Sequence, residues 1–280
     1  MAANLRILAH NAADSAVITA SASAGALLPA NLQVDEKAKV WRSTEPTATL
    51  TLTWAAHQPI NSIALFWTNF SSSATIRARV YANPSDGAPA LDETHQPDPP
   101  QALGGLDWGV DALARSGASR SGSPQHEQIW LASTVSARKV VLDISDKDVA
   151  DGYLQVSRIA CGARWELATN YGYGATVQWV DRAKPARAES GDLRAEYLTR
   201  FRRMAIKLDW IASTSDRDRL LALAAAGVGR PMWICGRPSE PDDTALQQIY
   251  ALWGAFAPEP TLTHSFFANW AADPVFEEFA

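Results

Sequence analysis

Cysteine is scarce in this sequence, which has only Cys161 and Cys235 among 280 residues. Two cysteines this far apart, without a C-x-x-C spacing, match neither a disulfide framework nor a zinc site. We therefore expect both to be buried and reduced, as in a protein that folds in a cytoplasm. Runs of 18 apolar residues are also missing, and the first 20 residues lack the unbroken apolar stretch of a signal peptide. The sequence thus predicts no membrane insertion.

A strong excess of charge of either sign is absent as well. Charged residues make up 20% of the chain, the formal net charge is −5 and the isoelectric point is near 5.6. This balance gives no reason to expect nucleic acid or an acidic membrane as a partner. By contrast, 47% of the residues are hydrophobic and 11 are tryptophan. We expect most of the tryptophans to fill β cores, and others to serve interfaces or sugar-stacking surfaces.

Catalytic and metal-binding motifs are missing too. The five histidines have no metal-ligand spacing, and no G-x-S-x-G, G-x-G-x-x-G or G-x-x-x-x-G-K-[ST] pattern occurs. The adjacent acids 242–243 and 277–278 are expected to be solvated surface. The sequence therefore predicts no metal, no cofactor, no catalytic residue and no enzymatic activity. Because a glycosidase can place its two carboxylates far apart in the sequence, an accessory part of a glycan-degrading enzyme stays a lesser alternative.

The first half of the chain has the pattern of β-strands. In residues 48–54, Leu50, Leu52 and Trp54 alternate with three threonines, which predicts a half-buried strand. Residues 60–70 and 74–83 continue in the same way. Residues 83–128 are rich in Pro, Gly, Ser and Asp, and we expect a long loop with little regular structure there. Leu106 and Trp108, near its middle, would dock back onto the body.

Strands resume after that loop, at residues 128–146 and 152–162, the second with a break near Ser157. Short strands between turn signals indicate a sandwich or jelly roll. The second half, by contrast, is α+β: strands at 175–181 and 201–211, a helix in 215–231 capped by Ser215 and ended by Gly227, and a strand at 231–237. Residues 242–256 could be a helix that runs into a strand. We place the domain boundary between residues 163 and 164, which gives domains 1–163 and 164–280.

The opening loop carries a resemblance to a known family. Its features are a small-residue stretch, a Pro-x-Asn-Leu step and a Trp-x-Ser, followed later by an Ala-Arg-aliphatic strand; the residues are Ala20 to Ser23, Pro29, Asn31, Leu32, Trp41, Ser43, Ala137, Arg138, Val140 and Val141. Over about residues 5–162 this resembles the discoidin, galactose-binding-like jelly roll. The resemblance implies that Leu32 and Trp41 pack under the sheet and pin the polar loop across the barrel mouth. Loops at that mouth bind sugars or lipid headgroups in many family members.

The second half resembles the ring-forming part of distal tail proteins of tailed bacteriophages. The residues that carry this likeness are Trp165, Gly172, Gly174, Trp179, Leu208, Asp209, Trp210 and Trp233. It implies a structural virion protein of the tail tip or baseplate, assembled in the host cytoplasm. A closed ring of three or six copies would link tail tube and tail hub proteins through head-to-tail contacts. Aromatic and arginine side chains favour such interfaces, and the expected interface residues are Trp165, Trp179, Arg182, Arg200 and Arg202.

A carbohydrate-binding receptor module is the main alternative. It would need an exposed aromatic platform and a nearby polar group, for which the candidates are Trp108, Trp130 and Asp107. In a tail-tip protein the same jelly roll would face outward, where it could contact neighbouring proteins or cell-surface glycan.

Overall fold

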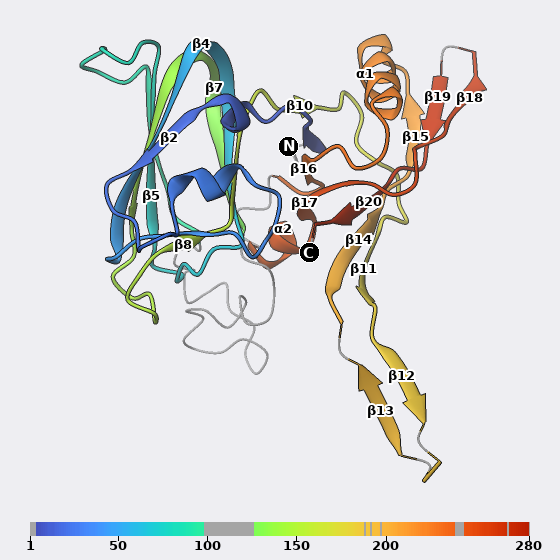
Figure 1. Ribbon diagram of the computed structural model, residues 1–280. Helices are drawn as coiled ribbons and strands as arrows, with labels where there is room; N and C mark the ends of the chain where they lie inside the picture. The colour runs from blue at the N-terminus through green and yellow to red at the C-terminus, as the bar shows by residue number, and fades with distance from the viewer. Residues whose placement is uncertain are drawn as a thin grey trace, which may run out of the picture.

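The chain forms two β-rich bodies that lie side by side (Figure 1). The computed structural model describes residues 4–97, 126–187, 189–190, 192–196, 198–238, 244–267 and 269–279. We call residues 11–162 the sandwich, and residues 5–8 together with 165–279 the second body. The predicted fold class, mainly β with a strand-rich first half and an α+β second half, is confirmed.

The sandwich is built on an antiparallel sheet with strand order β2-β4-β7-β5-β6, and β9 also pairs with β4. Its strands are β2 (Val17–Ala20), β3 (Trp41–Arg42), β4 (Thr47–Phe66), β5 (Thr75–Tyr81), β6 (Leu91–His95), β7 (His126–Ser145), β8 (Gln155–Val156) and β9 (Arg158–Gly162). Two 3₁₀-helices complete it: η1 (Ala12–Ser15) and η2 (Pro29–Gln33). The predicted break near Ser157 is confirmed, because β8 ends before this residue and β9 begins after it.

Alternation along β4 separates core from surface. Leu50 and Leu52 are fully buried and Trp54 is 3% exposed, as the sequence predicts, while Thr49 and Thr51 on the other face are partly exposed. The facing residues of β5 and β7 continue the same core. Successive side chains of a strand point to opposite faces, so along residues 47–53 one face of the sheet is apolar and the other is polar. Toward residues 62–66 both faces are buried, the second one against the second body.

The stretch 83–128 contains more structure than its composition predicts. Residues 91–95 form β6, which pairs antiparallel with β5, and residues 126–128 already belong to β7. The β6 sequence Leu-Asp-Glu-Thr-His is polar because an edge strand has a large exposed surface. Leu106 and Trp108 lie outside the described residues.

The opening loop packs as the family resemblance implies. Leu32 and Trp41 are fully buried in the sandwich core. The Asn31 side-chain amide donates to the Val40 carbonyl at 2.8 Å, and the Trp41 indole donates to the Ala22 carbonyl at 3.2 Å. The loop is therefore a fixed structural latch, with its polar segment held between two buried anchors.

The second body contains a seven-stranded sheet of order β10-β1-β16-β17-β20-β14-β11. Its strands are β1 (Arg6–Leu8), β10 (Trp165–Glu166), β11 (Thr176–Asp181), β14 (Arg200–Ala205), β16 (Met232–Cys235), β17 (Ala251–Phe256) and β20 (Val275–Glu278). A three-stranded sheet, β15-β19-β18, adjoins it: β15 (Leu208–Ile211), β18 (Leu262–Phe266) and β19 (Asn269–Ala272). Strands are present at 175–181 and 231–237 as expected. The single strand expected at 201–211 is divided into β14 and β15, which belong to different sheets.

The first strand of the chain belongs to the second body. β1 pairs with β10 through Ile7 and Trp165 and with β16 through Ile7 and Ile234. Both chain ends therefore lie in the second body (Figure 1). The boundary between residues 163 and 164 stays a prediction, but residues 6–8 do not fold within the sandwich.

Helix α1 (Thr214–Ala225) begins two residues earlier than the sequence predicts. Its N-cap is Ser213, whose hydroxyl accepts a hydrogen bond from the Asp216 amide, so the prediction of Ser215 as the cap is wrong. Both serines precede the acidic residues Asp216 and Asp218, which is why the sequence alone did not separate them. Gly227 follows the helix with φ of +82°, as expected for a C-terminal glycine. The predicted helix-to-strand passage is α2 (Thr244–Ile249) followed by β17.

A β-ribbon projects from the second body. Beyond β11 and β14 the polypeptide continues as β12 (Lys184–Arg187) and β13 (Leu193–Glu196). Among the described strands these two pair only with each other. Figure 1 shows this ribbon, which we call the arm, reaching away from both bodies. A two-stranded ribbon without a covering layer is marginally stable by itself.

The two bodies meet through an aromatic seam. The seam consists of apolar residues from both bodies: Leu8, Ala64, Phe66, Trp67, Ala160, Trp233 and Trp253, with Trp130 and Phe279 against them. Large aromatic side chains supply much of the energy of such contacts. The expectation that many tryptophans fill cores therefore holds, and here the core lies between the bodies.

Candidate functional site

A polar groove crosses the solvent face of the sandwich. It has a volume of about 540 Å³ and lies over the ends of β4, β5 and β7, beside the residues that follow β2. Hydroxyl side chains line much of it: Ser21, Thr47, Thr49, Thr75 and Ser145. We call it the sandwich groove. These residues reach solvent because alternation places them opposite the buried face of the same strands.

Three charged side chains also line the sandwich groove, and two of them are paired. Arg79 donates to the Asp143 carboxylate at 2.5 Å, and the Thr49 hydroxyl donates to the same group at 2.9 Å. Arg77 forms a two-pronged pair with Asp92, and this contact lowers the pKa of the Asp92 carboxyl.

Glu45 supplies the third charge. It lies at the rim, and its carboxylate has no hydrogen bond or ion pair within the described part of the chain. A groove of hydroxyls, neutralised charge pairs and one free carboxylate suits a ligand that donates and accepts many hydrogen bonds and carries little charge.

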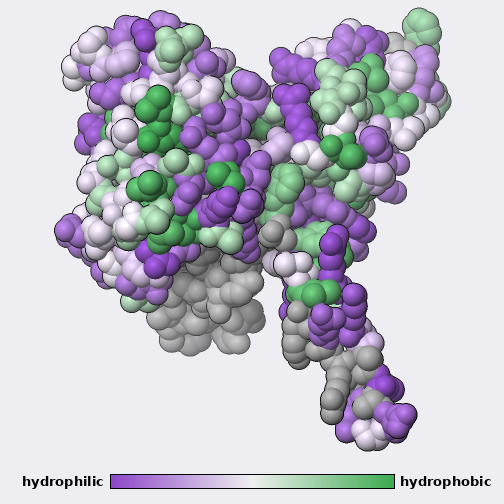
Figure 2. Space-filling model, viewed as in Figure 1, coloured by the Kyte–Doolittle hydropathy of each residue, from purple (hydrophilic) through white to green (hydrophobic). Residues whose placement is uncertain are grey.

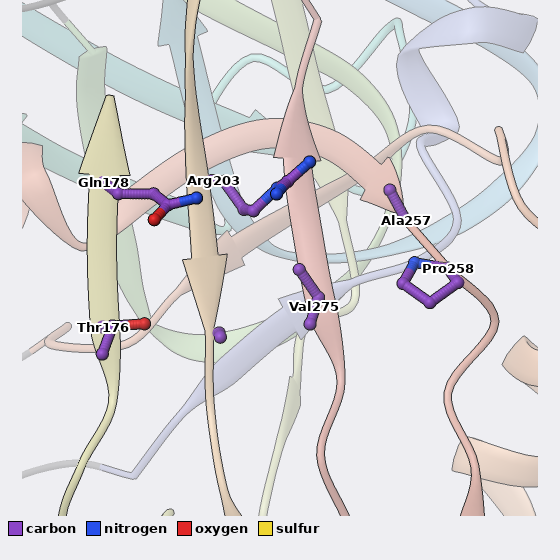
Figure 3. A pocket seen from close by; sticks show the side chains of 7 residues that line it. Thr176, Gln178, Arg203, Ala257, Pro258 and Val275 are labelled. Atoms are coloured by element: carbon purple, nitrogen blue, oxygen red, sulfur yellow. The ribbon is translucent and has the colours of Figure 1, made fainter. Parts of the chain in front are cut away.

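A second hollow lies on the seven-stranded sheet, toward the ends of β11 and β14 that are farther from the arm. Its volume is about 290 Å³, and Figure 3 shows Thr176 and Gln178 of β11 beside Arg203 of β14, with Val275 and Pro258 completing the wall. Arg203 hydrogen-bonds to the Glu277 carboxylate. The expectation that Glu277 and Glu278 are solvated surface acids is wrong for Glu278, whose buried contacts are described below. Glu277 is partly exposed and ion-paired, and residues 242–243 lie outside the described residues.

The residues proposed for sugar stacking are not assembled as an exposed platform in the described structure. Trp108 and Asp107 lie outside the described residues. Trp130 stacks on Trp233 at 4.3 Å between ring centroids, so one face of its ring is occupied by the second body. The Arg6 guanidinium lies 4.7 Å from the same ring. Trp130 thus contributes to the seam, and its role in ligand binding stays a prediction.

The residues proposed for an oligomer interface divide into two buried and three exposed side chains. Trp165 is 8% exposed and donates to Asp216 at 2.9 Å, and Arg202 is 2% exposed. Both have their partners inside the chain. Trp179 is 52% exposed, Arg200 pairs with a neighbouring strand residue at the surface, and Arg182 is exposed beside the Phe201 ring.

Large apolar side chains gather on the surface of the second body. Nine of the eleven exposed examples among the described residues belong to it: Tyr173, Trp179, Leu198, Trp210, Leu221, Val228, Ile249, Phe266 and Phe267. Figure 2 shows apolar residues on the part of this body that holds α1, β15, β18 and β19. Single exposed apolar side chains are ordinary on a protein surface, whereas a contiguous apolar patch is typical of a surface that another molecule covers.

The described residue ranges hold neither a metal-binding cluster nor a membrane-spanning helix. No cluster of three or more His, Cys, Asp or Glu side chains with metal-binding geometry occurs in them. No helix in these ranges combines the length and the apolar character needed to cross a bilayer. Cys161 and Cys235 are buried and unpaired, and burial raises the pKa of both thiols, for Cys235 to about 12.

Sequence reasoning missed the sandwich groove, because its residues come from four separate segments. Each hydroxyl or charge is ordinary for the solvent face of a strand. The only usable signal was the alternation in residues 48–54, which correctly placed the threonines of β4 on one face. Alternation does not say which strands are neighbours, and the neighbours create the groove.

No protein-family model and no curated protein sequence matches the chain. Solved structures to which it is similar include a chitosan-binding module of a chitosanase/glucanase from Paenibacillus sp. IK-5, with 17% identity, a TM-score of 0.38 and coverage of 55% of this chain and 99% of that one. A module of Clostridium perfringens in complex with GalNAc-β-1,3-galactose has 9% identity, a TM-score of 0.37 and coverage of 55% and 100%. A Ruminococcus gnavus GH29 fucosidase in complex with fucose has 10% identity and a TM-score of 0.38, over 55% of this chain and 26% of the enzyme. Likeness at this level concerns the fold and does not assign a ligand to this chain.

Proposed function

We propose that the protein is a non-enzymatic glycan-binding protein, and that it holds a neutral glycan in the sandwich groove. The observation that carries this is the chemistry of the groove, five hydroxyl side chains around neutralised ion pairs. Sugar hydroxyls both donate and accept hydrogen bonds, as serine and threonine hydroxyls do. The Glu45 carboxylate would accept the strong, charge-assisted bonds from such a ligand.

Binding of the full chain to an array of neutral and acidic glycans tests this proposal. The best neutral hit is then titrated by calorimetry against Glu45→Gln and Thr47→Val, both exposed and therefore expected to fold. Loss of a charge-assisted hydrogen bond should weaken binding about tenfold for Glu45→Gln. Glu36→Gln, an exposed acid elsewhere on the sandwich, is the matched control. The proposal fails if no glycan binds, or if the groove variants bind a glycan as tightly as the wild type does.

A second function is favoured by the arm and by the apolar surface of the second body. A ribbon that lacks a covering layer gains stability when another molecule packs on it. We infer that the second body attaches the protein to copies of itself, in a ring of three or six. Placement in a phage tail tip, between tube and hub proteins, stays a prediction from the sequence resemblance, as does location in a virion.

Light scattering and negative-stain microscopy test self-assembly. The wild type should form closed rings at high concentration. Replacing residues 184–196 by Asn-Gly, a turn suited to a two-residue hairpin, should leave a folded monomer. Monomers of the wild type at every concentration would contradict self-assembly. Rings formed by the shortened variant would show that self-assembly does not need the arm.

A further inference from the structure

A buried polar cluster joins the sandwich to the second body. His126, the first residue of β7, meets Arg202 of β14 and Glu278 of β20, while Gln248 of α2 lies beside them. All four side chains are at most 9% exposed. The Gln248 side-chain amide exchanges two hydrogen bonds with the backbone of His126, accepting at 2.8 Å and donating to the carbonyl. The cluster is thus a direct polar link beside the aromatic seam.

Arg202 is the centre of this cluster. It donates to Glu278 through Nε at 3.0 Å and through a terminal nitrogen at 2.6 Å. Its other terminal nitrogen donates to the Gln248 carbonyl at 2.5 Å. The nitrogen that reaches Glu278 also lies 2.6 Å from Nε2 of His126.

This geometry fixes the protonation state of His126. A guanidinium is always charged and can only donate hydrogen bonds, so Nε2 of His126 must accept. The imidazole is therefore neutral with its proton on Nδ1, a buried atom for which the described residues offer no partner. Protonation at Nε2 would remove the acceptor and place a second cation against Arg202. The Glu278 carboxylate, 3.5 Å from Nε2, would offset only part of this cost.

We propose that His126, Arg202 and Glu278 form a proton-sensitive clamp, which holds β14 against the sandwich at neutral pH and releases it when His126 is protonated. β14 leads into the arm, so the clamp couples the acidity of the surroundings to the root of the arm.

The charges that face His126 support this direction. Burial is the largest effect and lowers its pKa from 6.5; Arg202 lowers it further, whereas Glu278 and, more weakly, Glu127 raise it. Phe66 at the end of β4 and Trp67 directly after it turn aromatic rings toward the imidazole, and α2 contributes the uncharged Gln248. His126 binds a proton less well in the intact clamp than in the released one, so the clamp weakens as pH falls below 6.5.

Hydrogen exchange of the full chain, corrected for the intrinsic rate at each pH, tests the clamp. Between pH 7.5 and 5, protection of residues 126–131 and 200–205 should fall about tenfold relative to β5. In His126→Gln, whose amide oxygen still accepts from Arg202, this pH dependence should disappear. His264→Gln, on β18 and stacked on Trp270, is the matched control and should behave as the wild type does. Equal pH dependence in wild type and His126→Gln overturns the proposal.

A second measurement uses the wild-type protein and does not depend on the folding of a variant. Histidine side-chain NMR of the wild type should show His126 neutral, with its proton on Nδ1, at pH 7. Its protonation on acidification should coincide with the loss of protection at the seam. A His126 imidazole that is charged at pH 7, or that titrates while the seam remains protected, overturns the proposal.

Discussion

At the scale of single residues, buried arginines connect the two bodies. Arg158 of the sandwich pairs with Asp14 at 2.7 Å and with Asp35 at 3.1 Å, and its guanidinium lies 4.9 Å from the Trp253 ring. The Trp253 indole in turn donates to Asp35 at 3.0 Å. The opening loop that contains Asp35 therefore touches the second body as well as latching the sandwich.

Glu278 should account for most of the folding stability that the protein loses at acidic pH. Burial by itself raises its pKa, but the Arg202 guanidinium, which donates two hydrogen bonds to the carboxylate, outweighs this and lowers the pKa from 4.5 to about 2. A carboxyl with a depressed pKa stabilises the folded state above its unfolded value, so this stability is lost between about pH 4.5 and pH 2. We expect Glu278→Gln to lower the free energy of unfolding at pH 7 by about 3 kcal/mol, because it leaves Arg202 buried without its counter-charge.

Urea unfolding from pH 7 to pH 3 measures this effect. The difference between wild type and Glu278→Gln should shrink as pH falls. Glu166→Gln, which removes the carboxylate partner of Arg6 at the surface, is the control. If the free energies of unfolding of wild type and Glu278→Gln differ by the same amount from pH 7 to pH 3, the depressed pKa of Glu278 is contradicted.

Asp216 holds the start of α1 to β10, an edge strand of the seven-stranded sheet. Its carboxylate accepts from the Trp165 indole at 2.9 Å and from the Ala168 amide at 2.9 Å. Asp216→Ala would leave a buried indole N–H without a partner, so we expect a loss of about 2 kcal/mol in the free energy of unfolding. Thermal and urea unfolding measure it. The exposed Asp218→Ala is the control, and an equal loss in both variants would show that helix charge rather than this anchor is responsible.

Single-residue burial could be predicted from the sequence only in part. The alternation in residues 48–54 gave the buried side of β4 correctly, because one face of that strand meets the core and the other meets water. Alternation gave no sign that Arg202, named as a candidate interface residue, would be buried with its partners inside the chain. A strand that packs between two bodies has no solvent face at that point, and this depends on tertiary contacts.

At the scale of elements, helix α1 depends on its cap. Ser213 accepts from the Asp216 amide, one of the amides that have no partner within the helix. We expect Ser213→Ala to lower the free energy of unfolding by about 1 kcal/mol. Chemical denaturation measures this change.

Ser215→Ala is the informative control for that prediction, because the sequence alone favoured Ser215 as the cap. It lies inside the first turn, where alanine is a better helix former than serine, so its effect should be small or stabilising. A larger loss for Ser215→Ala than for Ser213→Ala would contradict the observed helix start.

Element boundaries followed from local signals, whereas sheet partners did not. The strand at 231–237 and the helix-to-strand passage in 242–256 were both predicted from apolar pattern and length. The family resemblance over about residues 5–162 placed Arg6–Leu8 with the jelly roll. Its partners are residues 165–166 and 233–235, and three apolar residues hold no information about pairing at that distance.

At the scale of the whole molecule, the aromatic seam makes the two bodies interdependent. Phe66 and Trp67 of the sandwich contact Trp233 and Trp253 of the second body within one buried cluster. Residues 1–163 alone would expose this surface and leave β1 without both of its partner strands. We therefore expect this fragment to bind hydrophobic dye and to aggregate.

Expression of residues 1–163 and of the full chain, compared by size-exclusion chromatography and dye binding, tests this interdependence. A fragment of residues 9–163 is the control that separates the unpaired β1 from the exposed seam. A monomeric fragment 1–163 that binds no dye would show that the seam contributes little to the solubility of the sandwich.

The pairing of β1 with β10 has a topological consequence. Leu8 and Trp165 lie at the adjoining ends of two antiparallel neighbours, so everything between them occupies the place of a hairpin loop. In this description the second body is the host domain and the sandwich is an insertion between two of its strands. Insertions whose ends lie close together are tolerated because they leave the register of the host sheet unchanged. The host could therefore accept a different recognition domain at this position, provided that the new domain also covers Trp233 and Trp253.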